Sequence, residues 1–330
     1  MGKKIKWGIL GSAHIATEHV IPAMLRCQYG EVYAIASRST EKAQNIAEQF
    51  GIPECYGSYE ELLVDKEVDA IYIPLPNHLH VQWAIKALEA DKHVLVEKPV
   101  GLSSKEAERL LQETKKYPHL KVMEAFMYRH HPQWIKVKEL VDQKAIGDIK
   151  TIQSSFSFFE DDPNSIVNSK EFGGGSLMDI GCYPISLSRF MFNSEPKSIS
   201  SVIEYHPDFK VDVSASGILE FETGTSVFFS STQLADNQQA QIFGTKGNIK
   251  FELPFNPPID RPSKIWVTIG DDCQTIEFET CNQYTIQADL FALAIINNTP
   301  VPTPLEDSVK NMIVIEKLEE SNLKGQRIPM

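Results

Sequence analysis

The sequence predicts an α/β protein with two domains: a doubly wound parallel sheet, then an α/β domain built on a large, mostly antiparallel open sheet. Three observations predict this fold class. Apolar strands alternate with helices through the first 126 residues, strands dominate after about residue 148, and 330 residues are enough for two cores. We place the boundary near residue 125, which gives domains at 1–125 and 126–330.

The first domain is expected to alternate regularly between strands and helices. Its strands are predicted at 4–10, 31–37, 70–73, 93–96 and 121–126, and its helices at 14–28, 40–50, 59–63, from 77 onward and at 103–116. Thr40 and Ser103 are the expected N-caps of two of these helices. Because the strands are apolar throughout, both faces of the sheet should be covered by helices.

The second domain changes to a strand-rich pattern punctuated by turn dipeptides such as Thr223-Gly224. Strands are predicted at 148–159, 197–205, 213–222, 225–233, 238–243, 247–252, 264–269 and 274–279, and helices at 132–143, 174–190, 285–297 and 306–323. The polar loop at 160–172 is expected to be mobile and to cover the site. This pattern indicates a largely antiparallel sheet with helices on one face.

Composition argues against several classes of function. A formal net charge of −12 repels polyphosphate, so no nucleic-acid partner is expected. The sequence contains no run of 18 apolar residues, so no membrane span is expected. A strand is predicted from residue 4, so no secretory signal peptide is expected before it. Five scattered cysteines without C-x-x-C pairs indicate a reducing, cytoplasmic location and no zinc site. The His130-His131 pair lacks the spacing of metal ligands, so no metal is expected.

The turn "WGILGSAHIA" after the first strand predicts a dinucleotide site. Its core, Gly11-Ser12-Ala13-His14-Ile15-Ala16, matches G-x-G-x-x-A except that Ala13 replaces the second glycine. Gly11 permits a tight turn, and the small Ser12 and Ala13 let backbone N–H groups approach a pyrophosphate at the helix N-terminus. The alternative is a tight turn that binds no ligand. The position of the motif between the first strand and the first helix favours dinucleotide binding over this alternative.

The end of the second strand favours NADP over NAD. An NAD site usually has an acid there, to hold the ribose hydroxyls. This sequence has Ser37 followed by Arg38, and arginine pairs with a 2′-phosphate. Lys42, one turn into the next helix, adds a second positive charge. The alternative is that Arg38 is only a solvated surface residue.

Four stretches together resemble the Gfo/Idh/MocA oxidoreductases. They are "WGILGSAHIA", "PLPNHLH" at 74–80, "EKP" at 97–99 and "GGGSLMDIGCYPI" at 173–185, which cover nearly the whole chain in the family's order. Within that family, "EAFMYRHHPQ" at 124–133 and "MDIGCYP" are most similar to the dimeric dihydrodiol dehydrogenase and NADP-dependent xylose dehydrogenase branch.

The resemblance implies an N-terminal Rossmann domain and a C-terminal α/β domain with an open sheet that forms dimers or tetramers. It also implies a cis Lys98–Pro99 bond and a helix that presents "MDIGCY" to the nicotinamide. Many members carry D-x-x-x-H on this helix. Here Tyr183 stands where histidine is common, as is typical of the dihydrodiol-type branch.

Lys98, Asp179 and Tyr183 are the predicted catalytic residues. Lys98 follows a buried strand at the edge where doubly wound sheets bind ligands, and Asp179 and Tyr183 share a helix face at i and i+4. Oxidation of an alcohol needs a group that takes the hydroxyl proton. We expect Tyr183 to be this acid/base, with Lys98 as its electrostatic partner; the reverse assignment is the close alternative. Asp179 would bind a substrate hydroxyl or hold Lys98.

Further candidates line the same two sites. Leu75, Pro76, Asn77, His80, Glu97 and Lys98 are expected near the cofactor, although Asn77 also suits a helix cap and His80 a structural hydrogen bond. Glu97 orients its neighbours or the nicotinamide side, or forms a structural salt bridge. Arg129 and Phe158 are the substrate candidates, with sheet core as the alternative for the phenylalanine.

These observations predict an NAD(P)-dependent oxidoreductase. It would transfer hydride between nicotinamide and a secondary or anomeric alcohol, or the matching carbonyl, of a sugar, polyol or cyclic diol. One alternative is a ketone or anhydro-sugar reductase that uses the same chemistry in the other direction. The other alternative is a non-catalytic NADP-binding regulatory protein of the same fold.

Overall fold

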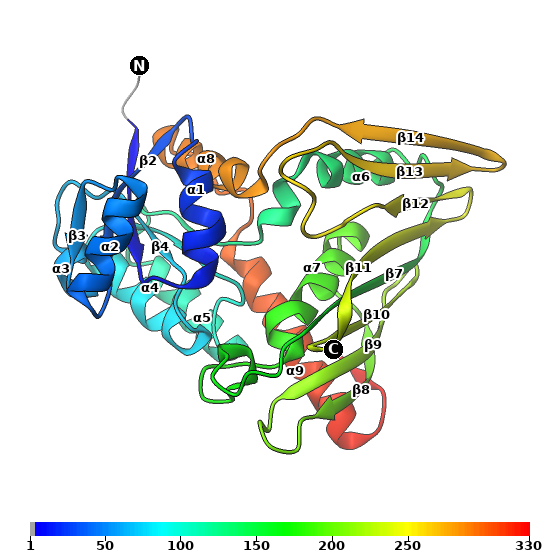
Figure 1. Cartoon of the computed structure of the whole chain (residues 1–330). Helices are drawn as coiled ribbons and strands as arrows, with labels where there is room; N and C mark the ends of the chain where they lie inside the picture. Colours follow the sequence, from blue (N-terminus) through cyan, green and yellow to red (C-terminus); the bar gives the residue numbers. More distant parts are fainter. Residues whose placement is uncertain (1–3) are drawn as a thin grey trace. The chain divides into compact units, whose positions relative to one another are not determined.

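The computed structural model describes residues 4–330 and divides the chain into two compact units (Figure 1). The first unit comprises the described residues up to Met127 together with Asn282–Val309, and the second comprises Tyr128–Cys281 and Lys310–Met330. The sequence predicted a single cut at residue 125. The structure differs because the chain returns to the first unit for one helix before it completes the second.

The first unit is a doubly wound parallel sheet with strand order β3-β2-β1-β4-β5-β6. All six strands pair in parallel with their neighbours, and the strand order runs outward from β1 in both directions. Its strands are β1 Ile5–Leu10, β2 Gly30–Ala36, β3 Glu54–Tyr56, β4 Ala70–Ile73, β5 His93–Val96 and β6 Val122–Glu124. The predicted class of this sheet is confirmed.

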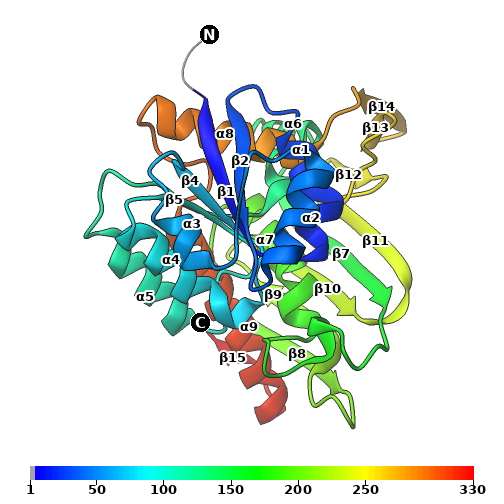
Figure 2. The same cartoon turned by 60° about the vertical axis from the view of Figure 1, so that its left-hand side comes forward.

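Helices cover both faces of this sheet. Helices α1 and α2 lie on one side and α3, α4 and α5 on the other, as the two views show (Figures 1 and 2). The bounds are η1 Ala16–Val20, α1 Ile21–Met24, α2 Thr40–Phe50, α3 Tyr59–Leu63, η2 Asn77–Leu79, α4 His80–Glu89, α5 Ser104–Thr114 and, after the second unit, α8 Gln283–Ile296. Strands β4 and β6 are buried at every residue and β1 and β5 at all but one, which explains their apolar runs, whereas the edge strand β3 is partly exposed.

Helix α8 belongs to the first unit because its apolar side completes that unit's core. The Phe291 ring packs on the Trp7 ring of β1 with centroids 5.6 Å apart, and Ala288 and Ala292 are buried beside it. Asp289 accepts hydrogen bonds from the backbone N–H groups of Gln28 and Tyr29, at 3.1 and 2.9 Å. These contacts attach α8 to the segment between α1 and β2.

Helix ends differ in two places from the sequence prediction. Ser39, not Thr40, is the N-cap of α2, because the Ser39 side chain accepts the Lys42 N–H. Ser103 caps α5 as expected. Asn77 starts the 3₁₀ turn η2 and its carbonyl accepts the His80 N–H, whereas neither Pro76 nor Leu79 provides a side-chain cap.

The second unit is a nine-stranded sheet with order β14-β13-β12-β11-β7-β10-β9-β8-β15. Its pairs are antiparallel except β7 with β10, so the mostly antiparallel prediction is confirmed. The strands are β7 Ile149–Phe159, β8 Ser198–Tyr205, β9 Asp212–Glu220, β10 Thr225–Ser231, β11 Gln233–Gly244, β12 Gly247–Phe251, β13 Ser263–Ile269, β14 Asp272–Phe278 and β15 Ile328–Pro329.

The helices of the second unit lie on one face of its sheet (Figure 1). They are α6 Pro132–Asp142, η4 Ile166–Asn168, η5 Leu177–Gly181, α7 Cys182–Phe192 and most of α9, Leu305–Lys324; η3, Met127–His130, joins the units. Small polar contacts join the layers, such as Ser188 Oγ to Ser226 Oγ at 2.7 Å and Ser201 Oγ to the Leu318 carbonyl. The opposite face of the sheet carries no helix among the described residues.

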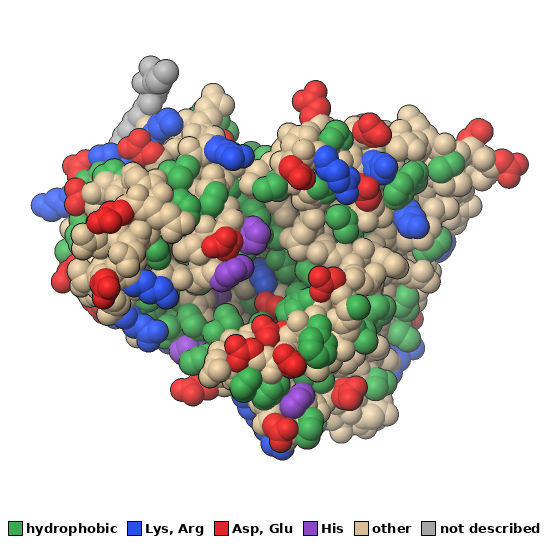
Figure 3. All heavy atoms as spheres, viewed as in Figure 1, with side chains coloured by type: hydrophobic (Ala, Val, Ile, Leu, Met, Phe, Trp, Pro, Cys, Tyr) green, Lys and Arg blue, Asp and Glu red, His purple; other side chains and the backbone are tan. Residues whose placement is uncertain are grey.

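Two further features concern the charge on the surface and the length of the helices. On the face drawn in Figure 3, acidic and basic side chains lie scattered among one another over both units, so this face offers no continuous basic band to a polyphosphate. Within residues 4–330, no helix has the length and apolar character that crossing a membrane requires.

Candidate functional site

The turn after β1 has the geometry of a phosphate-binding loop. Gly11 has φ +107°, a value that L side chains rarely adopt, and a Cβ there would come within 2.9 Å of the Leu75 side chain. The Gly11 N–H donates to the Ala36 carbonyl at 2.8 Å, and the Ala13 carbonyl accepts the Ala16 N–H at 2.9 Å. The chain therefore folds back directly into the first helix, where the leading N–H groups lack intrahelical partners and can bind an anion.

The remaining residues of this turn are accessible. Ser12, Ala13 and Ile15 are half-buried and His14 is exposed. The helix then widens into the π-helical turn η1, a feature that often marks functional sites and that the sequence prediction of a regular helix missed.

The end of β2 exposes a guanidinium beside this turn. Ser37 is buried and its Oγ accepts the Ser39 N–H, whereas Arg38 and Lys42 are exposed. Burial raises the pKa of the Tyr59 hydroxyl, and a hydrogen bond from Arg38 opposes that rise. Tyr59 itself packs edge-on against Trp83 at 4.9 Å. Arg38 is thus oriented by an aromatic pair, at the position where a 2′-phosphate would be bound.

His80 acts as a structural tie between two loops, not as a surface for the cofactor. Its ring is wholly buried, with Nδ1 2.7 Å from the Pro99 carbonyl and Nε2 2.6 Å from the Leu75 carbonyl. Burial lowers its pKa to about 4, so the imidazole is neutral and only one of the two contacts carries a proton. Leu75 is buried, and Pro76 and Asn77 are half-buried on the loop that His80 holds.

The Glu97–Lys98–Pro99 segment is held from several sides at the end of β5. The Tyr72 hydroxyl donates to Glu97 Oε1 at 2.6 Å, and Glu97 Oε2 accepts the Lys98 N–H at 3.2 Å. The Lys98–Pro99 peptide is cis. One residue further, the Val100 N–H donates to Glu124 Oε1 at 2.7 Å. Glu97 is buried and orients this segment, while the Lys98 side chain remains half-exposed.

A second tyrosine, which sequence reasoning missed, lies near this segment within the first unit. Burial raises the pKa of Tyr284, the Glu97 carboxylate adds to the rise, and the Lys98 ammonium opposes it. The Tyr284 ring also stacks on His19 at 5.9 Å with an interplanar angle of 19°. Tyr284 lies near Glu97 because helix α8 packs on the first unit. No local sequence motif predicts this packing.

In the second unit, Tyr183 lies in an aromatic cluster. Its ring is 5.8 Å from Tyr128, 5.5 Å from Phe156 and 5.4 Å from Phe255, measured between centroids. Tyr183 is 5% exposed, and its ring is held by these aromatic contacts. Phe158 is half-buried on the same sheet face as Phe156, two residues along β7.

Helix η5–α7 carries Asp179 and Tyr183, and its first turn is π-helical. Asp179 is half-buried, and its N–H donates to the Gly175 carbonyl at 3.0 Å. The sequence predicted a regular helix from 174. The structure instead has a π turn over Leu177–Gly181, a second instance of this rare geometry beside predicted site residues.

Arg129 is buried and bonded to the same helix. Its Nε donates to Ser186 Oγ at 3.1 Å and its Nη2 to the Ser186 carbonyl at 3.3 Å, while its guanidinium lies over the Phe190 ring. Ser186 Oγ also pairs with the Tyr128 hydroxyl at 2.8 Å. These contacts hold Arg129 against α7, and its contact with substrate stays a prediction.

Hydrogen bonds hold the 160–172 loop together and tie it to the glycine run that follows it. Asn168, 3% exposed, donates from Nδ2 to the carbonyls of Glu160 and Asp162, at 3.2 and 2.9 Å. The Gly175 N–H donates to the Val167 carbonyl at 2.8 Å. Part of the loop's polar composition serves these bonds, and its mobility stays a prediction.

The adjacent histidines have no ligand geometry. His131 caps α6 through the Gln133 N–H, and its Nε2 lies 3.3 Å from Cys281 Sγ. Burial lowers the pKa of both His130 and His131 to about 4. Within residues 4–330, no cluster of three or more histidine, cysteine, aspartate or glutamate side chains could hold a metal ion.

A doubly wound domain with a glycine turn before its first helix is typical of proteins that bind a dinucleotide. The model of the oxidoreductase family with NAD-binding Rossmann fold matches residues 5–126, and the Gfo/Idh/MocA C-terminal domain matches residues 134–250. The chain belongs to the Gfo/Idh/MocA family of oxidoreductases.

Curated relatives match along most of this chain. An uncharacterized oxidoreductase of Rhizobium meliloti is 42% identical, covering 97% of this chain and 98% of the relative. The D-xylose 1-dehydrogenase (NADP(+)) 2 of Haloferax volcanii is 34% identical, covering 98% and 99%. The trans-1,2-dihydrobenzene-1,2-diol dehydrogenase of Xenopus tropicalis is 36% identical, covering 79% and 76%.

Solved structures share the whole architecture. A 3-ketoreductase from Actinomadura kijaniata, in complex with NADP and TDP-benzene, has a TM-score of 0.90 at 29% identity and covers 97% of this chain and 98% of its own. An aldose-aldose oxidoreductase from Caulobacter crescentus, complexed with glycerol, has a TM-score of 0.92 at 25% identity, covering 99% and 100%. The ketoreductase was also solved with a tyrosine replaced by phenylalanine and with a lysine replaced by alanine.

Proposed function

We propose that this oxidoreductase uses NADP to interconvert an alcohol and a carbonyl on a sugar, polyol or cyclic diol. The observation that carries the NADP preference is Arg38, exposed at the end of β2 and hydrogen-bonded to Tyr59, where an NAD site would have an acid. The named relatives support both parts, since they act on xylose or a dihydrodiol and the xylose enzyme uses NADP.

The residues of the first unit would hold the cofactor. Gly11 and the helix N–H groups of Ser12 to Ile15 would bind the pyrophosphate, and Arg38 with Lys42 the 2′-phosphate. The positive φ at Gly11 fits such a turn, and a side chain at Gly11 would clash with Leu75. When bound, the nicotinamide supplies the hydride acceptor or donor.

Tyr183 would accept the substrate hydroxyl proton at its phenolic oxygen during oxidation and return it during reduction. The Lys98 ammonium would stabilise the phenolate and anchor the reacting oxygen. Asp179 would orient a neighbouring hydroxyl or Lys98. The reverse assignment, with Lys98 as the direct acceptor, uses the same two residues.

The test is a cofactor titration followed by a spectrophotometric screen. NADPH and NADH are titrated by fluorescence, and the protein is then mixed with NADP and a panel of aldoses, polyols and cyclic diols. Growth of absorbance at the reduced-nicotinamide band with one class would establish reaction and substrate class. Equal affinity for NADPH and NADH would contradict the NADP preference.

A reductive direction is the second candidate. It is favoured by the 3-ketoreductase, whose structure superimposes over nearly the whole chain. The same preparation is therefore also mixed with NADPH and keto-sugars. Turnover only in this arm would assign the chain as a reductase.

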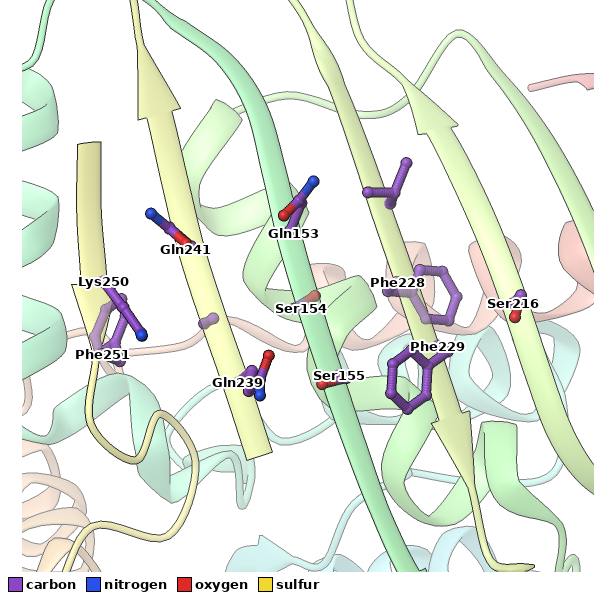
Figure 4. Close-up of a pocket in the computed structure, with 12 residues that line it drawn as sticks. Gln153, Ser154, Ser155, Ser216, Phe228, Phe229, Gln239, Gln241, Lys250 and Phe251 are labelled. Atoms are coloured by element: carbon purple, nitrogen blue, oxygen red, sulfur yellow. The ribbon is translucent and has the colours of Figure 1, made fainter. Parts of the chain in front are cut away.

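We further propose that the helix-free face of the nine-stranded sheet joins two copies of the chain. A hollow of about 320 Å³ lies on this face, lined by Gln153 and Phe229 among others (Figure 4). Val202, Ile218 and Phe229 are 74%, 50% and 37% exposed there. Such a broad, partly apolar face is typical of an interface. Light scattering of Val202→Lys against wild type tests this, and an unchanged mass would overturn it.

The state of the five cysteines fits a protein kept in a reducing compartment. Cys27, Cys55, Cys182, Cys273 and Cys281 are all free thiols. We therefore propose a cytoplasmic location, which subcellular fractionation tests.

A further inference from the structure

Helix α8 places its first turn firmly against the first helix of the dinucleotide domain. Asn282 caps α8, since its Oδ1 accepts the Tyr284 N–H at 2.9 Å. Thr285 Oγ1 donates to the Ala23 carbonyl at 2.9 Å. The position of Tyr284 is therefore fixed by hydrogen bonds on both sides of it, entirely within the first unit.

From this position Tyr284 connects two parts of the predicted cofactor site. Its ring stacks on His19, which is exposed on the π turn directly after the glycine turn. His14, in the turn itself, lies 6.4 Å from His19 between ring centroids. At the other end, Tyr284 is close enough to Glu97 and Lys98 for their charges to act on its hydroxyl. An aromatic strip thus runs from the glycine turn to the end of β5.

The sheet order determines which half of a dinucleotide would meet this strip. Arg38 ends β2, on one side of β1, so the adenosine half with its 2′-phosphate would lie toward β2 and β3. The nicotinamide half must then extend the other way, over the ends of β4 and β5. Glu97 and Lys98 end β5, and Tyr284 lies near them.

We propose that Tyr284 contacts the nicotinamide half of the bound dinucleotide, an inference that rests on the proposed cofactor site. Its ring provides a flat apolar wall, and its hydroxyl can donate to or accept from a ribose hydroxyl or the carboxamide. Burial raises the pKa of this phenol, so it remains neutral and acts as a binding group, distinct from the acid/base role assigned to Tyr183.

The experiment compares a whole cofactor with its adenosine half. NADPH is titrated by fluorescence and 2′,5′-ADP by calorimetry on wild type, Tyr284→Ala and Tyr284→Phe. We expect Tyr284→Ala to weaken NADPH about tenfold and Tyr284→Phe less, with 2′,5′-ADP unchanged within about twofold in both. Tyr29→Ala is the matched control, because Tyr29 packs on the same core as Tyr284. It should leave both ligands unchanged.

The outcomes separate the two proposals. Unchanged NADPH affinity in Tyr284→Ala, or equal weakening of NADPH and 2′,5′-ADP, would overturn the contact with the nicotinamide half. If wild type failed to bind 2′,5′-ADP, the proposed NADP preference would fail. The Tyr284 contact would then be decided by the same comparison with NADH and ADP-ribose.

Discussion

The backbone N–H of Leu177 donates a 2.6 Å hydrogen bond to Asp212 Oδ2. This bond joins the start of β9 to the first turn of the helix that carries Asp179 and Tyr183. Gly175 passes so close that a Cβ there would lie 2.0 Å from Asp212 Oδ1, and its φ is +113°. Asp212 is thus the anchor of the helix from which Tyr183 extends.

Asp212→Ala should lower the free energy of unfolding by roughly 1–3 kcal/mol, because it leaves a buried N–H without an acceptor. It should also lower kcat more than it raises KM for NADP, since only the second unit is altered. Asp212→Asn is the matched variant: it retains one acceptor oxygen and should keep most of the stability and turnover. Urea unfolding and steady-state kinetics measure both quantities. Equal kinetics in the two variants would show that the anchor does not govern Tyr183.

Tyr183→Phe should reduce turnover about 10²–10⁴-fold, the usual contribution of a general acid/base, while NADPH affinity stays within about twofold. Tyr128→Phe is the control. It removes a hydroxyl from the same aromatic cluster, but that hydroxyl is bonded to Ser186. Tyr128→Phe should therefore cost mainly stability. Turnover of Tyr183→Phe within a few fold of wild type would exclude the acid/base role.

Lys98→Met retains much of the lysine stem and removes only its charge. We expect turnover to fall at least 10²-fold, and the alkaline rise in the pH profile of kcat to shift to higher pH, because the phenolate loses its cation. The readout is kcat measured from pH 6 to 10 on wild type and variant. An unshifted profile with reduced kcat would assign Lys98 to substrate anchoring alone.

Arg38→Ala should raise KM for NADP about tenfold or more and leave KM for NAD within about twofold, because only NADP offers a phosphate to the guanidinium. Lys115→Ala, which removes an exposed lysine of α5's C-cap, serves as the charge control. Steady-state kinetics with both cofactors supply the comparison. Parallel changes for the two cofactors would remove Arg38 from 2′-phosphate recognition.

The fold was predictable because its signals are local. Strands β1, β4 and β5 are largely apolar runs, and the helices between the strands show apolar residues at helical spacing. Gly11 marks a turn whose positive φ favours glycine. Lys98 was singled out by its place at a strand end, Tyr183 by its helix face shared with Asp179, and both by the order of the motifs. Such patterns depend on a few consecutive residues, which a single sequence displays directly.

The unpredicted features depend on contacts between distant residues. Tyr284 reaches the neighbourhood of Lys98 only because α8 packs on Trp7, more than 250 residues earlier in the chain. The sequence allowed a structural hydrogen bond for His80 but could not name its two partners, the carbonyls of Leu75 and Pro99. The π turns also have no known sequence signal here, because they differ from α-helix by one inserted residue.

Stability should fall as the pH is lowered from 7 to 5, because four histidines are held in their neutral form. Burial lowers the pKa of each to about 4, whereas 6.5 is the ordinary value; they are His80, His93, His130 and His131. Between these two values the unfolded chain binds protons that the native chain does not, so acid favours unfolding. Asp212 acts in the opposite sense: burial raises its pKa to about 6, so its native form gains a proton first.

The four histidines outweigh that one carboxyl, and the net loss should be on the order of 6 kcal/mol by pH 5. Urea unfolding followed by circular dichroism at pH 7 and pH 5 gives the difference. His80→Gln keeps an amide donor for one carbonyl but cannot titrate, so its pH dependence should be about a third smaller than that of wild type. A stability that stayed level between pH 7 and 5 would mean that the native histidines carry protons, and that the two carbonyls facing His80 are strong enough to hold an imidazolium in the core.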